Sequence, residues 1–177
     1  MLLPPRRAGR LALTLVLAVY GVVCLRHPGE FRLIDNVNLA IHETGHLVFA
    51  PFGEFVHALG GTLFQLLMPA AFVGYFLRRG DRHAASVALW WVGESCWNVA
   101  VYVADARAQL LPLVGGGEHD WAYLLAELGW LSRDAQVARA VHLAGVVIFV
   151  LAVAWGLLAA LGDPTPADDA GLDAAPA

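Results

Sequence analysis

The sequence has few charged residues and no lysine. Charged residues make up 15% of the 177 positions, whereas hydrophobic residues make up 59%. An average soluble domain contains about 25% charged and about 45–50% apolar residues, and the mean hydropathy here is +0.62. This apolar excess is larger than a water-facing surface accommodates, so we expect an integral membrane protein in contact with the lipid bilayer.

Basic charge is also sparse, because all 11 basic residues are arginines and the net charge is −4. Beyond Arg6, Arg7 and Arg10 no basic run suggests a nucleic-acid surface, so we exclude nucleic acid as a partner. The two cysteines, Cys24 and Cys96, lie in apolar runs and form no CxxC pair. Small buried hydrophobic side chains are therefore their expected role.

Four apolar runs are candidate membrane spans, since about 20 apolar residues cross a bilayer. They cover residues 11–25, 55–77, 84–104 and 140–161. No small-residue cleavage site follows the first run, which we interpret as a retained span. A basic turn at 78–83 predicts a helical hairpin, and the positive-inside rule assigns this turn and the N-terminus to the cytoplasm. We expect a protein of the bacterial plasma membrane.

The segment 33–52 is apolar overall but carries seven polar residues: Asp35, Asn36, Asn38, His42, Glu43, Thr44 and His46. Helices this polar are tolerated in a membrane where they face a bundle interior or a water-filled cavity. If the N-terminal arginines and the basic turn at 78–83 are both cytoplasmic, this segment must enter and leave the membrane on the same side. We therefore predict an all-α membrane protein with about four spanning helices plus a polar re-entrant or short membrane helix.

Two further segments complete the predicted organisation, in which residues 1–162 form a single membrane domain. Residues 121–131 contain tryptophans and leucines suited to a helix at the membrane interface. Residues 163–177 are rich in alanine, aspartate and proline and contain too few apolar residues to fold, so we predict a disordered acidic tail.

The motif HETGH, which runs from His42 to His46, carries the predicted chemistry. Side chains four residues apart lie on one face of a helix, so both imidazoles can reach one metal ion. Glu43 points about 100° away from His42, which suits a general base better than a third ligand. Zinc lowers the pKa of a bound water to about 7, and Glu43 would accept its proton as it attacks a carbonyl.

The motif is followed by glycine and polar or helix-bending residues: Gly60, Gly61, Gln65 and Pro69. With a later helix that ends in an acidic residue, this pattern resembles the site-2 protease family of intramembrane zinc metallopeptidases over about residues 34 to 110. The resemblance implies that the two motif histidines and a distant aspartate bind Zn²⁺ and that Glu43 is the catalytic base. The aspartate at the corresponding place is Asp105, which lacks the glycine and proline neighbours of the family pattern.

Two candidates therefore stand for the third ligand. Asp105 ends the predicted helix 84–104 on the side where segment 33–52 enters, although an ion pair with Arg107 would explain it equally well. The alternative is His119, which follows glycines 115–117 in a loop expected on the same side. In the simpler interpretation that loop is a flexible turn, with Asp120 capping the next helix.

Other polar residues have less specific interpretations. Glu94 and Asn98 share one helix stripe with Asp105, which is typical of a polar seam between helices, and Asn98 is also a candidate to stabilise an oxyanion by its polarity. His57 could line the cavity, but a position at the membrane interface or beside a metal ligand is favoured. Asp35 either caps the helix that carries HETGH or orients an imidazole.

The leading hypothesis is a membrane-embedded zinc metallopeptidase that cleaves a peptide bond of a membrane protein or peptide. In this hypothesis His42, His46 and Asp105 bind Zn²⁺ and Glu43 is the catalytic residue. The alternative is a non-hydrolytic metal-binding membrane protein that acts as a scaffold or binds a partner. Hydroxylases and desaturases with two metal ions are disfavoured, because they require several histidine clusters.

Overall fold

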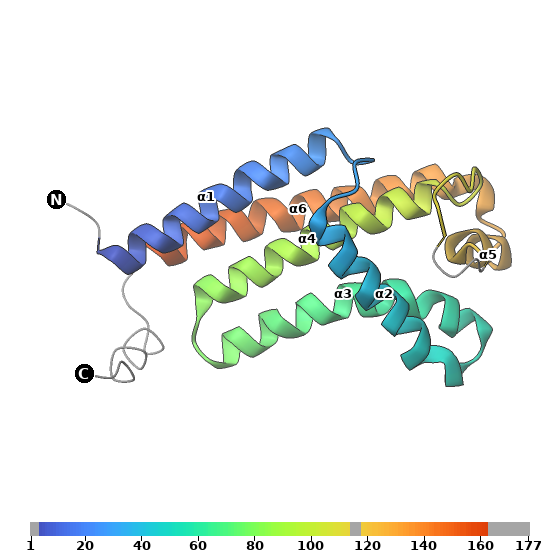
Figure 1. The fold of residues 1–177 in the computed structure, drawn as a ribbon, viewed down its shortest axis with the longest axis horizontal. Coiled ribbons are helices and arrows are strands. Elements are labelled where there is room, and N and C mark those ends of the chain that lie inside the picture. The colour runs from blue at the N-terminus through green and yellow to red at the C-terminus, as the bar shows by residue number, and fades with distance from the viewer. Residues whose placement is uncertain (1–3, 114–117, 163–177) are drawn as a thin grey trace.

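The computed structural model describes residues 4–113 and 118–162, and within them all regular structure is helical. The helices are α1 (Pro5–Arg26), α2 (Leu33–Phe49), η1 (Ala50–Phe52), α3 (Glu54–Arg78), α4 (Arg82–Ala104), α5 (Asp120–Glu127), η3 (Leu131–Arg133) and α6 (Asp134–Leu161) (Figure 1). The predicted all-α fold is confirmed. The predicted glycine turn at 115–117 and the predicted tail at 163–177 lie outside the described residues.

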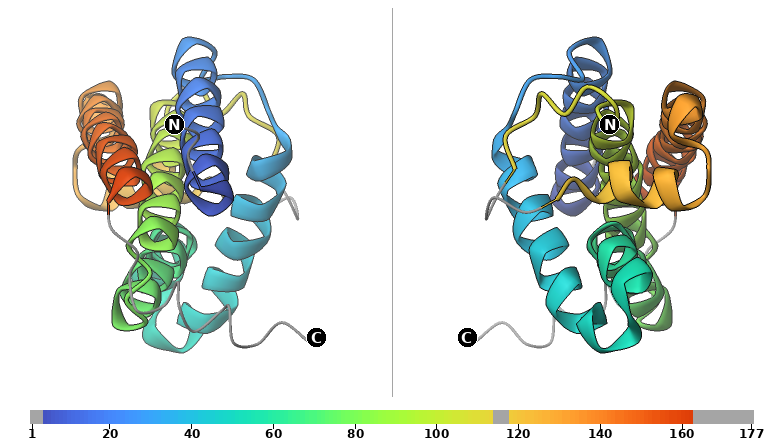
Figure 2. Two further views of the ribbon diagram at one scale, coloured as in Figure 1. Left: turned by 90° about the vertical axis from the view of Figure 1, so that its left-hand side faces the viewer. Right: turned by 90° about the vertical axis from the view of Figure 1, so that its right-hand side faces the viewer.

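Helix α4 is the centre of the bundle and packs against α1, α3 and α6 (Figure 2). Its contact with α6 is especially close at Gly93 and Gly145. A β-carbon on Gly145 would come within 2.8 Å of the Gly93 carbonyl oxygen and 2.7 Å of the Trp97 ring. Since no larger residue fits there, these two glycines set the separation of the helices.

Three helical stretches are long and apolar enough to cross a membrane: Pro5–Arg26, Glu54–Arg78 and Leu131–Leu161. Their outer faces expose large apolar side chains, such as Val19 on α1 and Val147 on α6, as a lipid-facing surface does. The fourth predicted span, 84–104, is helical but is not among the three. More than half of α4 is buried inside the bundle, so it can carry polar residues that a lipid-facing helix excludes.

The two arginine clusters meet at one end of the molecule. Arg10 of α1 forms an ion pair with Asp81 before α4 at 3.7 Å, and the Thr14 hydroxyl lies 3.0 Å from Nε2 of His83. Helix α1 leads away from this end and α3 leads back to it (Figure 1). The connection between them, which contains α2, therefore lies toward the opposite end.

Helix α2 begins at a side-chain cap and ends at a short 3-10 turn. The Arg32 amide donates to Oδ2 of Asp35 at 2.5 Å, so Asp35 caps the helix as one of the two interpretations predicted. The helix ends at Phe49 and a single 3-10 turn follows, whereas the sequence predicted one element to residue 52. Gly53, with a φ of +92°, then reverses the chain into α3.

We expect Gly145→Ala to lower the thermal stability of the protein in detergent. The added methyl group would overlap Trp97 and a backbone carbonyl, and overpacking of this kind costs about 1–3 kcal/mol. Gly74→Ala is the matched control, because a β-carbon at Gly74 meets nothing within 4 Å. Equal melting temperatures for the two variants would contradict the proposed packing of α4 on α6.

Candidate metal centre

Close packing of α2 against α3 builds the floor of the site. A β-carbon on Gly45 would overlap the Gly60 carbonyl oxygen, and one on Gly60 would come within 2.5 Å of the Phe49 side chain. At Gly61 a β-carbon would lie 2.5 Å from Nε2 of His42 and 2.6 Å from Nε2 of His46. The glycines therefore leave the space that both imidazole rings occupy.

Each motif histidine donates from Nδ1 to an acceptor on α3. Nδ1 of His42 lies 3.2 Å from Oε1 of Gln65, and Nδ1 of His46 lies 2.9 Å from the backbone carbonyl oxygen of His57. The Nδ1 atom of His57 in turn lies 3.0 Å from the carbonyl oxygen of His46. His57 thus lies beside a candidate ligand, which is one of the alternatives that the sequence left open.

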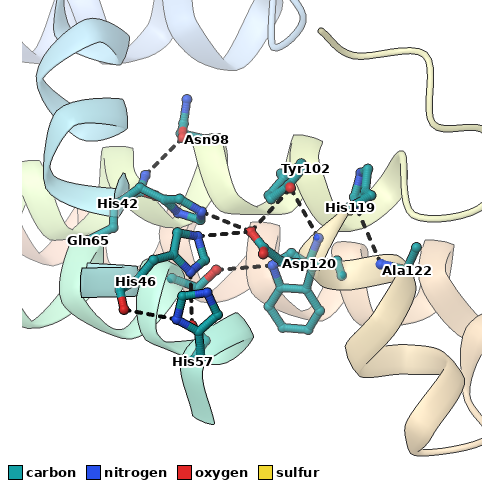
Figure 3. Close-up of polar contacts among 11 residues, drawn as sticks. His42, His46, His57, Gln65, Asn98, Tyr102, His119, Asp120 and Ala122 are labelled. Atoms are coloured by element: carbon teal, nitrogen blue, oxygen red, sulfur yellow. Dashed lines mark hydrogen bonds and ion pairs between the residues drawn. The ribbon is translucent and has the colours of Figure 1, made fainter. Parts of the chain in front are cut away.

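Asp120 completes a group of three potential metal ligands (Figure 3). Its Oδ2 atom lies 3.1 Å from Nε2 of His42 and 3.3 Å from Nε2 of His46. The three ligand atoms lie within 4.8 Å of one another. The site is mostly buried, with 9%, 14% and 15% of the side chains of His42, His46 and Asp120 exposed.

Neighbouring helices hold Asp120 in this position. The Tyr102 hydroxyl of α4 donates to Oδ2 of Asp120 at 3.2 Å and accepts from the Asp120 amide at 3.3 Å. Next along the chain, Nε1 of Trp121 donates to the Thr62 hydroxyl of α3 at 3.1 Å. Asp120 is therefore bound directly to α4, and its neighbour Trp121 binds the same short helix of eight residues to α3.

The charge arrangement suits a cation. Burial by itself would raise the pKa of Asp120, but when the His42 and His46 rings are protonated, their hydrogen bonds and charges outweigh burial and hold that pKa far below its ordinary value. When the rings are neutral and both Nδ1 atoms donate elsewhere, each ring instead turns an Nε2 lone pair toward the carboxylate. Three electron-pair donors then face one another, and a metal cation can be shared among them. Two imidazole nitrogens and a carboxylate oxygen fit Zn²⁺.

The structure brings Asp120, not Asp105, to the motif histidines. Both Asp105 oxygens instead accept backbone N–H bonds, from Leu110 at 2.9 Å and Leu111 at 3.0 Å, so that Asp105 shapes the chain that follows α4. Its expected partner Arg107 donates to Asp134 at 2.7 Å. Asp105 is the residue at which α4 ends, and its side chain stabilises the turn that follows.

His119 also stands outside the ligand group. Its Nδ1 accepts from the Ala122 amide at 3.2 Å, so His119 caps α5, where the sequence had suggested Asp120 as the cap. Burial lowers the pKa of His119, and its Nε2 atom lies 3.5 Å from Oδ2 of Asp105. The sequence signal for Asp120 was its place beside His119 after the glycine run, but nothing in the sequence distinguished a cap from a ligand.

The polar stripe on α4 connects to α2. Glu94 accepts from Asn38 at 2.8 Å, which agrees with its interpretation as part of a seam between helices. Asn98 donates to Asp35 at 2.9 Å and accepts from Gln65 at 2.8 Å. Both polar atoms of Asn98 are thus already engaged, which leaves its suggested role at an oxyanion without support.

Glu43 lies where two cavities meet. A cavity of about 380 Å³ has mainly apolar walls from α4 and residues 111–113, and one of about 300 Å³ is lined by polar residues such as Glu54 and Tyr123. Glu43, Tyr102 and Leu113 line both cavities. The motif glutamate thus faces open space on both sides of the candidate ligands, as a group that acts on a bound molecule must.

Comparison of the chain with models of protein families, with curated proteins and with solved structures finds no match. The chemical interpretation of this site therefore depends on its own geometry.

We expect the purified full-length chain to contain one zinc ion, and Asp120→Asn to lose it because a carboxylate ligand becomes a neutral amide. Asp105→Asn is the matched control and should retain zinc, since Asp105 bonds to neither motif histidine and the amide oxygen still accepts one of its two backbone N–H bonds. Elemental analysis of the detergent-purified proteins measures the difference. Zinc in Asp120→Asn but not in Asp105→Asn would reassign the third ligand.

Gly61→Ala should also abolish zinc binding while the fold is retained. Its methyl group would occupy the space of the two Nε2 atoms, and the imidazoles would have to turn away from Asp120. Gly74→Ala, on the same helix but in open surroundings, should bind zinc like the wild type. Wild-type zinc content in Gly61→Ala would show that the rings do not need this close approach.

Proposed function

We propose that the protein is a membrane-embedded zinc metallopeptidase, with His42, His46 and Asp120 as the zinc ligands and Glu43 as the general base. The observation that carries this proposal is the convergence of both motif histidines and a carboxylate beside two cavities that Glu43 lines. The resemblance of HETGH to the site-2 protease motif agrees with it, with Asp120 in the role that the sequence assigned to Asp105.

Zinc would supply an acidified water and a Lewis acid for a carbonyl group. Glu43 would take the proton of that water and pass it to the leaving amine. Within residues 4–113 and 118–162 no hydrogen bond or ion pair engages the Glu43 carboxylate, so it is available as a base. Tyr102 would keep Asp120 oriented through its two hydrogen bonds.

The shape of the site supports a peptide as substrate. An extended chain that passes from the apolar cavity into the polar one would present a backbone carbonyl beside Glu43, because this residue lines both. An apolar segment would occupy the first cavity and a more polar segment the second. This is the character of a membrane protein or peptide where its chain leaves the bilayer.

The proposed topology has four spans, α1, α3, α4 and α6, with α2 as a re-entrant helix. Its support is that both arginine clusters meet at one end, while α2 joins helices that run in opposite directions. A cytoplasmic basic end follows from the positive-inside rule. The proposed location is the bacterial plasma membrane, with the metal centre toward the other face.

Glu43→Gln should keep one zinc ion per chain and lose peptide cleavage by about 10²- to 10⁴-fold, the contribution of a positioned general base. The assay uses full-length protein in liposomes with a set of quenched fluorescent transmembrane peptides. Glu127→Gln, an exposed position on α5, is the matched control and should cleave like the wild type.

Wild-type turnover by Glu43→Gln would refute this mechanism. Zinc binding by the wild type without cleavage of any peptide in the set would favour the alternative, a non-hydrolytic metal-binding protein.

A further inference from the structure

A chain of hydrogen bonds connects the start of α2 to His42 by way of α4 and α3. Oδ1 of Asp35 accepts from Nδ2 of Asn98 at 2.9 Å. Oδ1 of Asn98 accepts from Nε2 of Gln65 at 2.8 Å. Oε1 of Gln65 then lies 3.2 Å from Nδ1 of His42 (Figure 3). Asp35, Gln65 and His42 are at most 7% exposed, so water does not compete with most of these bonds.

The carboxylate of Asp35 determines which group donates and which accepts in each of these hydrogen bonds. A carboxylate accepts but cannot donate, so Asn98 must turn its NH₂ group to Asp35 and its oxygen to Gln65. Gln65 must then donate to Asn98, which leaves its oxygen for His42. An oxygen at that place requires a proton on Nδ1 of His42, so Nε2 of the neutral ring carries a lone pair that it can donate to a metal.

We propose that Asp35, Asn98 and Gln65 are positioning residues that hold His42 in the tautomer with the proton on Nδ1, and that they thereby increase metal affinity. This inference rests on the metal site proposed above. His46 obtains the same tautomer from the backbone carbonyl of His57 and needs no such chain. Asp35 can then have both of the roles that the sequence suggested. One carboxylate oxygen accepts from Asn98 and helps to orient the imidazole, and the other caps α2 by accepting from the Arg32 amide.

A second network between α2 and α4 provides a control within the same protein. Nδ2 of Asn38 donates to Oε2 of Glu94 at 2.8 Å, and Oδ1 of Asn38 accepts from Nε1 of Trp91 at 2.9 Å. Asn38 thus has the same two roles as Asn98, donor to a buried carboxylate and acceptor from a side-chain N–H. Its network makes no hydrogen bond to either motif histidine among the described residues.

The experiment measures zinc affinity of the full-length protein in detergent by competition with a chromophoric chelator. Partners of metal-bound histidines typically change metal affinity by about 10- to 100-fold when they are replaced. We expect a loss of this size for Asn98→Asp, which cannot donate to Asp35, and for Gln65→Met, which has no acceptor for His42. Gln65→Glu keeps an acceptor oxygen and should restore most of the affinity that Gln65→Met loses.

Asn38→Asp is the matched control for Asn98→Asp. It places a carboxylate against Glu94 just as Asn98→Asp places one against Asp35, and we expect its zinc affinity to equal that of the wild type. An equal loss in both variants would overturn the inference, because both networks would then act only through helix packing.

If the asparagine variants fail to fold, the variants Gln65→Met and Gln65→Glu still test the inference. Wild-type affinity in Gln65→Met, or an equal loss in Gln65→Met and Gln65→Glu, would overturn the inference as well. A wild-type protein that binds no zinc would instead refute the proposed metal site, so the two failures are distinguishable.

Discussion

The close approach of α2 to α3 is the constraint on which the candidate site depends. Gly45 and Gly60 let the two backbones touch, and Gly61 leaves room for both imidazole rings. At this separation the His46 ring reaches the carbonyl of His57, and the His57 ring reaches the carbonyl of His46. A wider separation would break this reciprocal pair and move the His42 ring away from Gln65.

The second organising feature is the concentration of polar side chains in an otherwise apolar bundle. Buried polar groups are costly unless they are hydrogen-bonded, and here they bond to one another between α2, α3 and α4. The central position of α4 makes this possible, because its polar residues face other helices and not the outer surface of the bundle. The apolar side chains of α1 and α6 are on the outer surface, and the hydrogen-bonded polar side chains are inside the bundle.

Several elements could be predicted from the sequence because their physical cause is local. Apolar runs of sufficient length predicted the four long helices, and the spacing of His42 and His46 predicted that both rings share one helix face. The ends were less accurate: α2 stops at Phe49, before a 3-10 turn that contains Pro51, and α5 stops at Glu127, before the chain turns at Gly129 with a positive φ. Such turns depend on where the next helix must pack.

The third member of the site could not be predicted in the same way. Asp105 and Asp120 are both acidic residues at helix ends with histidine or arginine nearby, and local sequence does not distinguish them. Their roles were decided by the turn after α4, where the amides of Leu110 and Leu111 engage Asp105, and by Tyr102, whose two hydrogen bonds hold Asp120 beside His42.

The sequence alone therefore determined the helical class, the presence of helices apolar enough to cross a membrane and the pair of histidines with its glutamate, since each follows from composition or from spacing within one helix. Only the tertiary structure decided which carboxylate lies beside them, which glycines admit the rings and which amide bonds to His42. Those contacts join residues 15 to 78 positions apart, and their geometry exists only after the helices have packed.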